Sequence, residues 1–285
     1  MTSDNARSRV TAAPYAERQL LVAMPDDVVA AAREAEARAA TASTAIDWKN
    51  VALAATRMLT GSVVSTLIDV TAEALTAWAR ARQSGLNVLQ VSQTEGRALT
   101  FPPGHPRNGV LYVGHPALPA VYYTMASFHR IAFEHKFPEA IELLMHLGAS
   151  HITVEHLRGW SREFASRLSV PLAASLGEAT ASAGASAKTT VTLLYEATLR
   201  GNDQPRLPEK LVWYPHEPTW QSIAKGRLEF GLTQFSLTVN YEDDFGVNAG
   251  LRLAAQKSGF ELGGNFEDHE ATTWKVVGTF GSGRG

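Results

Sequence analysis

The sequence predicts an α+β fold, in which a helical N-terminal region is followed by a mixed, mostly antiparallel sheet with packed helices. Over about residues 47–82, apolar side chains recur at spacings of three and four, as they do in amphipathic helices. Beyond residue 86, short branched and aromatic runs are separated by Gly and Pro, as in strands joined by turns. Several such runs are adjacent, which favours α+β over a doubly wound parallel sheet.

Two helical stretches are expected in the N-terminal region. Residues 26–43, DDVVAAAREAEARAATAS, are rich in good helix formers and begin with an Asp that can cap a helix. A second helical stretch, with one apolar stripe, is expected over about residues 47–82. Gly61 and Ser62 interrupt this stripe, so we expect a kink or a break there.

The periodicity then changes to that of strands. Three runs are expected to be strands: LNVLQVSQ at 86–93, RALTF at 97–101 and GVLYVGH at 109–115. A helix over about 125–147 follows, and Pro138 inside it predicts either a kink or a new helix start. SHITVEH at 150–156 is expected to be a strand.

The second half is expected to pair helices with strands. The predicted elements are a strand over 189–199, a helix over 217–231, a strand over 235–241, a helix over 243–259 capped by Asp243 or Asp244, and a hairpin over 260–280 turning at 267–270. Gly148, Gly231 and Gly259 each stand between a predicted helix and the next strand, where a left-handed residue is needed.

These elements suggest four segments along the chain. They are a helical N-terminal region (1–85), a first α/β segment (86–172), a flexible linker or loop (173–188) and a second α/β segment (189–281). The linker is expected because residues 173–187, AASLGEATASAGASA, are almost entirely small. We expect the two α/β segments to share one sheet.

Composition narrows the classes of function. The 285 residues carry a net charge of −2, which argues against nucleic-acid binding, and the absence of Cys excludes thiolate nucleophiles and disulfides. The longest obvious uncharged apolar run, residues 58–68, is shorter than the roughly 20 residues that span a bilayer. With a polar N-terminus, this predicts a soluble cytoplasmic protein and leaves peripheral membrane contact open.

Histidine is clustered. Six of the nine histidines lie within residues 115–156, where even spacing would place roughly one. Neutral imidazoles among carboxylates can ligate a transition metal, and the candidate ligands are His115, His129 and His156. His129 and His135 are six positions apart and point to different sides of a helix, so the segment alone cannot form a two-histidine site. The more frequent role of such histidines is capping or hydrogen bonding.

A second candidate site combines cations with an aromatic ring. In the stretch HLRGWSREFASRL, residues 156–168, Arg158, Trp160 and Arg162 form a combination that can bind an anionic ligand. Such a pattern is more often an amphipathic surface. No complete catalytic motif and no cofactor fingerprint is present.

Three functions remain, in decreasing order of preference. The first is a non-catalytic module that acts through a protein partner or a small-molecule ligand. The second is a metal-dependent hydrolase-type enzyme that uses the His-rich segment 115–156. The third is a membrane-acting effector that uses the amphipathic helices of residues 26–82.

Overall fold

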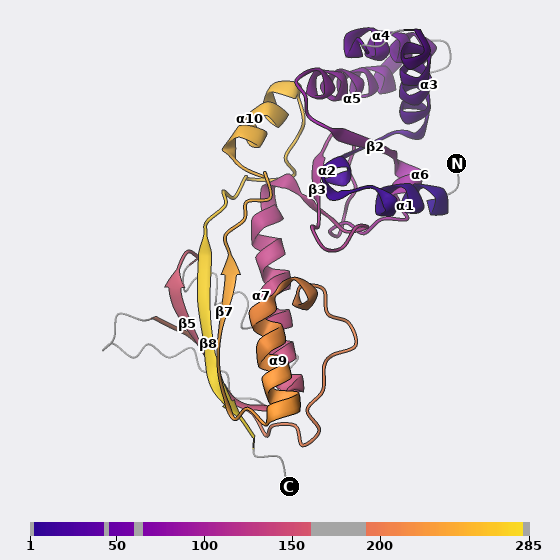
Figure 1. The fold of residues 1–285 in the computed structure, drawn as a ribbon. Coiled ribbons are helices and arrows are strands. Elements are labelled where there is room, and N and C mark those ends of the chain that lie inside the picture. The colour runs from indigo at the N-terminus through magenta and orange to yellow at the C-terminus, as the bar shows by residue number, and fades with distance from the viewer. Residues whose placement is uncertain (1–2, 43–45, 60–64, 161–191, 282–285) are drawn as a thin grey trace. The chain divides into compact units, whose positions relative to one another are not determined.

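The chain has an α+β fold, and its described residues form two four-stranded sheets. A computed structural model describes residues 3–42, 46–59, 65–160 and 192–281 (Figure 1). The described residues form two compact units. Unit 1 contains those within 1–130 and 245–268, and unit 2 contains those within 131–244 and 269–285.

Unit 1 has a mixed sheet in the order β2-β1-β3-β4. β1 (Leu20–Met24) pairs in parallel with β2 (Val88–Ser92) and antiparallel with β3 (Leu111–Gly114), which pairs antiparallel with β4 (Tyr122–Thr124). Its helices are α1 (Ser3–Ala12), α2 (Tyr15–Arg18), α3 (Asp26–Ala42), α4 (Trp48–Leu59), α5 (Ser65–Gln83), α6 (Gln93–Gly96), the short η1 (Met125–Ser127) and α10 (Ala249–Ser258).

β1 is an interior strand of the unit 1 sheet and was not predicted. Its side chains are buried on both faces, because Leu20, Val22 and Met24 join one hydrophobic cluster while Leu21 and Ala23 join the other. The first cluster includes residues of α3, α4 and α5, and the second includes a residue of α1. A strand buried on both faces lacks the alternation of apolar and polar residues that identifies a strand in a sequence.

Unit 2 has an antiparallel sheet in the order β6-β5-β8-β7. Its strands are β5 (Ala149–Arg158), β6 (Thr192–Thr198), β7 (Gln234–Tyr241) and β8 (Thr272–Phe280), and its helices are α7 (Phe128–His146), the short η2 (Tyr214–His216) and α9 (Pro218–Phe230). The first three residues of α7 belong to unit 1. Residues 86–172 therefore supply strands to both sheets, and β5 shares its sheet with strands from residues 189–281.

Most predicted helices are confirmed at close to their expected bounds, and α7 continues through Pro138. The left-handed glycines are also confirmed, since Gly231 and Gly259 have φ of 66° and 100° and close α9 and α10. α10 is capped by Asn248, whose side chain accepts the N–H of Leu251, so the expected Asp caps were wrong.

Two predicted β elements are wrong. Residues 97–101 form no strand, and only Thr100 makes an isolated bridge, to Val121. The expected hairpin over 260–280 contains one strand, β8, whereas Glu261 makes a bridge to Val110 in unit 1. The positive φ angles of Gly263 and Gly264 end that pairing, because extended strands require negative φ.

Some predictions fall on parts of the chain beyond this description. The linker at 173–188 and the break at Gly61 and Ser62 lie outside the described residues. Of the helices in the described ranges, none combines the length and the apolar composition needed to cross a membrane.

Candidate functional site

The three candidate metal ligands lie in different parts of the fold. His115 and His129 are fully buried in unit 1, and His156 belongs to β5 in unit 2. His115 Nδ1 accepts two backbone N–H groups from residues 117–118, His129 Nε2 lies 2.5 Å from the carbonyl oxygen of Val247, and His156 Nε2 lies 2.8 Å from a backbone carbonyl oxygen. In the part of the chain that is described, no three His, Asp or Glu side chains are grouped to hold a metal ion. The metal site stays a prediction.

Of the predicted anion-binding residues, Arg158 and Trp160 are described, and Arg162 lies outside the described residues. Arg158 forms an exposed ion pair with Glu242. Trp160 stacks on Tyr241, with ring centroids 5.6 Å apart, and its carbonyl oxygen accepts the indole N–H of Trp274. These contacts give both residues structural roles in unit 2, and anion binding by them stays a prediction.

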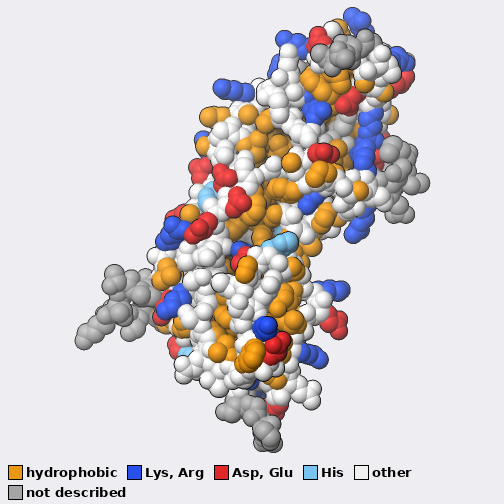
Figure 2. Space-filling model, viewed as in Figure 1, with side chains coloured by type: hydrophobic (Ala, Val, Ile, Leu, Met, Phe, Trp, Pro, Cys, Tyr) orange, Lys and Arg blue, Asp and Glu red, His pale blue; other side chains and the backbone are white. Residues whose placement is uncertain are grey.

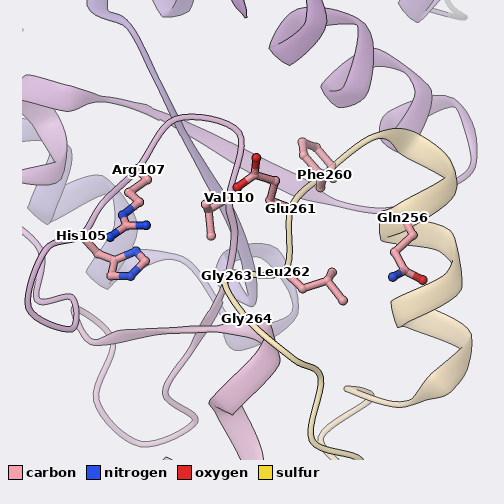
Figure 3. Close-up of a pocket in the computed structure, with 9 residues that line it drawn as sticks. All are labelled: His105, Arg107, Val110, Gln256, Phe260, Glu261, Leu262, Gly263 and Gly264. Carbon is pink, nitrogen blue, oxygen red and sulfur yellow. The ribbon is translucent and has the colours of Figure 1, made fainter.

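A pocket of about 510 Å³ in unit 1 is the strongest candidate for a functional site. This volume lies within the range of small-molecule sites, roughly 300–1,000 Å³. Figure 3 shows His105 and Arg107 on one side of the segment 260–264, and Gln256 of α10 on the other. Nine residues line the pocket: His105, Arg107, Val110, Gln256, Phe260, Glu261, Leu262, Gly263 and Gly264.

Hydrogen bonds to a buried tyrosine hold the loop that precedes β3. The hydroxyl of Tyr112 on β3 accepts the backbone N–H of Arg107 at 2.7 Å and lies 2.6 Å from Nδ1 of His105. Because Tyr112 is fully buried in the sheet, it fixes both residues relative to a rigid element. Among the described residues, the Arg107 guanidinium has one hydrogen bond, of 3.3 Å, from Nε to the carbonyl oxygen of Gly104.

The opposite wall comes from residues 260–264, which are anchored to the sheet by backbone hydrogen bonds. The Glu261 N–H donates to the carbonyl of Gly109, and the Glu261 carbonyl accepts the N–H of Leu111. Gly263 has φ of 76°, and a Cβ there would lie 2.7 Å from a side-chain carbon of Thr124. Only glycine therefore lets this segment pass so close to β4.

The electrostatics of the pocket favour a neutral imidazole. Burial lowers the pKa of His105, and the neighbouring Arg107 cation lowers it further. Burial raises the pKa of Tyr112, so its hydroxyl keeps its proton. Within the described residues, neither Arg107 nor Glu261 forms an ion pair. Both charges are therefore available to a ligand.

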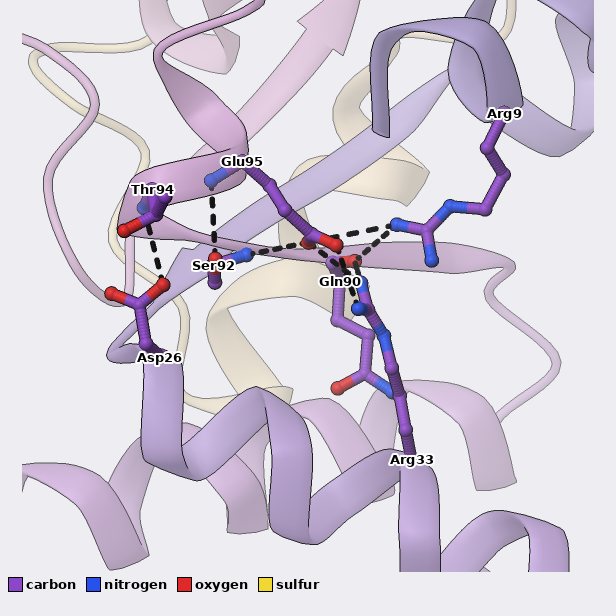
Figure 4. Close-up of polar contacts among 7 residues, drawn as sticks. All are labelled: Arg9, Asp26, Arg33, Gln90, Ser92, Thr94 and Glu95. Carbon is purple, nitrogen blue, oxygen red and sulfur yellow. Dashed lines mark hydrogen bonds and ion pairs between the residues drawn. The ribbon is translucent and has the colours of Figure 1, made fainter. Parts of the chain in front are cut away.

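A second group of charged residues in unit 1 has its partners within the fold (Figure 4). Glu95 on α6 is buried, and its two carboxylate oxygens each accept a 2.7 Å hydrogen bond from Arg33 of α3. Its carboxylate also accepts the backbone N–H of Ser92, which completes a capping box, and Arg9 of α1 lies 3.7 Å away. Desolvation would raise the pKa of Glu95, but the hydrogen bonds and charges of Arg33, Ser92 and Arg9 hold it below its ordinary value. This network joins three helices to the end of β2.

Unit 2 has an equivalent network around α7. Both carboxylate oxygens of the buried Glu139 accept backbone N–H groups from residues 212–214, at 2.7 to 2.9 Å. Lys136 donates to the carbonyl oxygen of Asn240 at 2.7 Å and pairs with Glu217. The loop before α9 is thereby held against α7, so these residues stabilise the fold.

His135 in the same network predicts a pH-dependent stability. Its Nδ1 accepts the indole N–H of Trp213 at 2.9 Å, which requires an unprotonated nitrogen. Burial lowers the pKa of His135, although the charge of Glu139 opposes the shift. Its stabilising contribution is therefore complete above the ordinary histidine pKa, about 6.5, and is lost as the pH falls below it, where the unfolded chain binds more protons.

We expect the stability advantage of the wild type over His135→Gln to shrink between pH 7.5 and pH 5.0. Urea unfolding of both proteins at the two pH values measures the difference in free energy of unfolding. A difference that stays constant across this interval would show that His135 titrates equally in the folded and unfolded chains.

Comparison with known proteins gives no assignment. No protein-family model, no curated protein and no solved structure matches this chain. The candidate site therefore depends on its geometry alone.

Proposed function

We propose that this chain is a non-catalytic module that binds a small molecule in the unit 1 pocket. The observation that carries the proposal is the composition of the pocket lining, where Arg107, Glu261, His105 and Gln256 line about 510 Å³ together with apolar side chains. A small-molecule site characteristically combines apolar walls with a few convergent polar groups. A cytoplasmic location remains part of the proposal.

The chemistry of the lining supports binding over catalysis. None of the nine lining residues carries a hydroxyl or thiol that could act as a nucleophile. The one imidazole, of His105, already uses Nδ1 in a hydrogen bond with Tyr112. These features favour recognition of a ligand without covalent chemistry.

The surface charge supports a small ligand over a nucleic acid. The net charge is −2, and basic and acidic side chains are interspersed over the described surface visible in Figure 2. Nucleic-acid binding relies on a basic stripe that neutralises several phosphates. A concave pocket with one cation and one anion suits a small molecule of mixed charge better.

Blocking the pocket should abolish small-molecule binding. Gln256 lies on the exposed face of α10 and lines the pocket, so Gln256→Trp adds bulk at the pocket without disturbing the core. A thermal-shift screen of amino acids, organic acids, sugar phosphates and mononucleotides identifies binders, and calorimetry measures their Kd. We expect binders of the wild type to lose at least about ten-fold in affinity for Gln256→Trp, a loss of about 1.4 kcal/mol.

Lys257→Trp is the matched control. Lys257 is the next residue on α10, is exposed and does not line the pocket, so the same substitution there should leave affinity unchanged. Equal affinities in all three proteins, or a screen without any binder, would contradict the proposed function.

A further inference from the structure

Two hydrogen-bond donors reach the pocket from one loop. Arg107 presents a guanidinium with both terminal nitrogens unengaged among the described residues, and His105 lies two positions before it. A guanidinium binds carboxylate and phosphate oxygens in a bidentate fork. The loop therefore offers at least one strong donor group for an anion.

The hydrogen bonds of Tyr112 decide which nitrogen of His105 carries its proton. The tyrosine hydroxyl accepts the N–H of Arg107, and Nδ1 of His105 is the acceptor within reach of its own hydrogen. A neutral imidazole that accepts at Nδ1 carries its proton on Nε2. His105 thus becomes a second donor, held in place by a residue of the sheet.

The other wall of the pocket carries hydrogen-bond acceptors, on Glu261 and Gln256. The carboxylate of Glu261 accepts hydrogen bonds only, and the amide of Gln256 both donates and accepts. A ligand that is anionic throughout would be repelled by Glu261, whereas an amine or hydroxyl on the ligand would be attracted to it.

We propose that the pocket binds a small molecule that has an anionic oxygen group, a phosphate or a carboxylate, held by Arg107 and His105, and an amine or hydroxyl donor directed to Glu261. This inference rests on the proposed function, because it assigns a ligand class to the same pocket. Arg107 and His105 favour the anionic group of the ligand, and Glu261 favours its amine or hydroxyl, so each contact can be tested separately.

Four probe molecules test the contributions of the oxyanion and of the amine separately. O-Phosphoethanolamine and γ-aminobutyrate both combine an amine with an oxyanion, a phosphate in the first and a carboxylate in the second. Ethanolamine lacks the oxyanion, and inorganic phosphate lacks the amine. In calorimetric titrations at low salt, we expect at least one of the first two to bind roughly ten-fold or more tightly than both ethanolamine and inorganic phosphate.

Substitutions on the two walls of the pocket should change these affinities in different ways. Arg107→Gln should weaken the preferred probe roughly ten-fold or more, and Arg107→Lys should restore part of the loss. Arg97→Gln is the control, because Arg97 is an exposed arginine of the same unit that does not line the pocket. Glu261→Gln should strengthen inorganic phosphate and weaken the amine-containing probe, since it removes both a repulsion and an attraction.

The outcomes distinguish this inference from the proposed function. One outcome is that ligands from the screen bind, that Gln256→Trp blocks their binding and that Arg107→Gln leaves it unchanged. The ligand class is then wrong, whereas the proposed small-molecule binding in the pocket is supported. If Arg107→Gln and Arg97→Gln weaken binding equally, the assigned oxyanion contact is wrong. The inference is supported if Arg107→Gln weakens binding while Arg97→Gln does not. It further requires that Glu261→Gln strengthen the binding of inorganic phosphate and weaken the binding of the amine-containing probe.

Discussion

Replacing Glu95 with Ala should destabilise the protein by about 3 kcal/mol, at the lower end of the range for removing one partner of a buried ion pair. The side chain of Glu95 is 4% exposed, accepts hydrogen bonds from Arg33 and from the N–H of Ser92, and lies 3.7 Å from Arg9. Without it, Arg33 loses both charge-assisted hydrogen bonds. The Arg33 side chain is 26% exposed, and this partial solvent access limits the cost.

Urea unfolding followed by circular dichroism measures this loss. Glu34→Ala is the control, because Glu34 lies one residue after Arg33 on α3 and pairs with Arg38 on the exposed surface. An exposed pair four residues apart contributes about 0.5 kcal/mol or less. Equal stabilities of the two variants would mean that the Glu95 network is not a structural element of unit 1.

Trp274→Ala should cost about 4 kcal/mol, within the range for removing a large buried aromatic side chain. Trp274 on β8 is 1% exposed, and its ring meets Phe133 and Phe137 of α7 edge-on, with centroids 4.8 and 4.9 Å apart. Its indole N–H also donates to the carbonyl of Trp160 at 3.2 Å. The substitution therefore removes the contacts of this ring with α7 as well as a hydrogen bond.

The matched control for this prediction is Leu228→Ala on α9, where the side chain is 41% exposed. Its loss should stay below about 1 kcal/mol, because little area is buried. The measurement is thermal unfolding of both variants by calorimetry. A loss for Trp274→Ala no larger than that for Leu228→Ala would contradict the packing of α7 on the sheet of unit 2.

Local patterns predicted most elements of the fold but not their partners. α7, α9 and β7 follow from apolar periodicity and from Gly and Pro at their ends, which are properties of neighbouring residues. β1 was missed because both of its faces are buried. The segment around Glu261 was predicted to form a hairpin, but Glu261 pairs with Val110, which is far away in the sequence. Such pairing depends on tertiary contacts that a local pattern does not encode.

The candidate site was harder to predict, for a related reason. The density of histidine in the sequence predicted a metal site, but His115, His129 and His156 hydrogen-bond to separate stretches of backbone. The pocket instead joins residues 105–110 to residues 256–264, which are about 150 positions apart. The available signals were weak: a His and an Arg in a Pro/Gly-rich loop, and an acidic residue before a Gly pair.

The most direct test of small-molecule binding in the unit 1 pocket is amide chemical-shift mapping. ¹⁵N-labelled protein is titrated separately with O-phosphoethanolamine and γ-aminobutyrate. We predict that the shifts of at least one titration are concentrated in residues 105–110 and 256–264, and that Gln256→Trp removes them while Lys257→Trp does not. Shifts concentrated elsewhere, for example around residues 156–160, or no shift with either probe, would contradict the account.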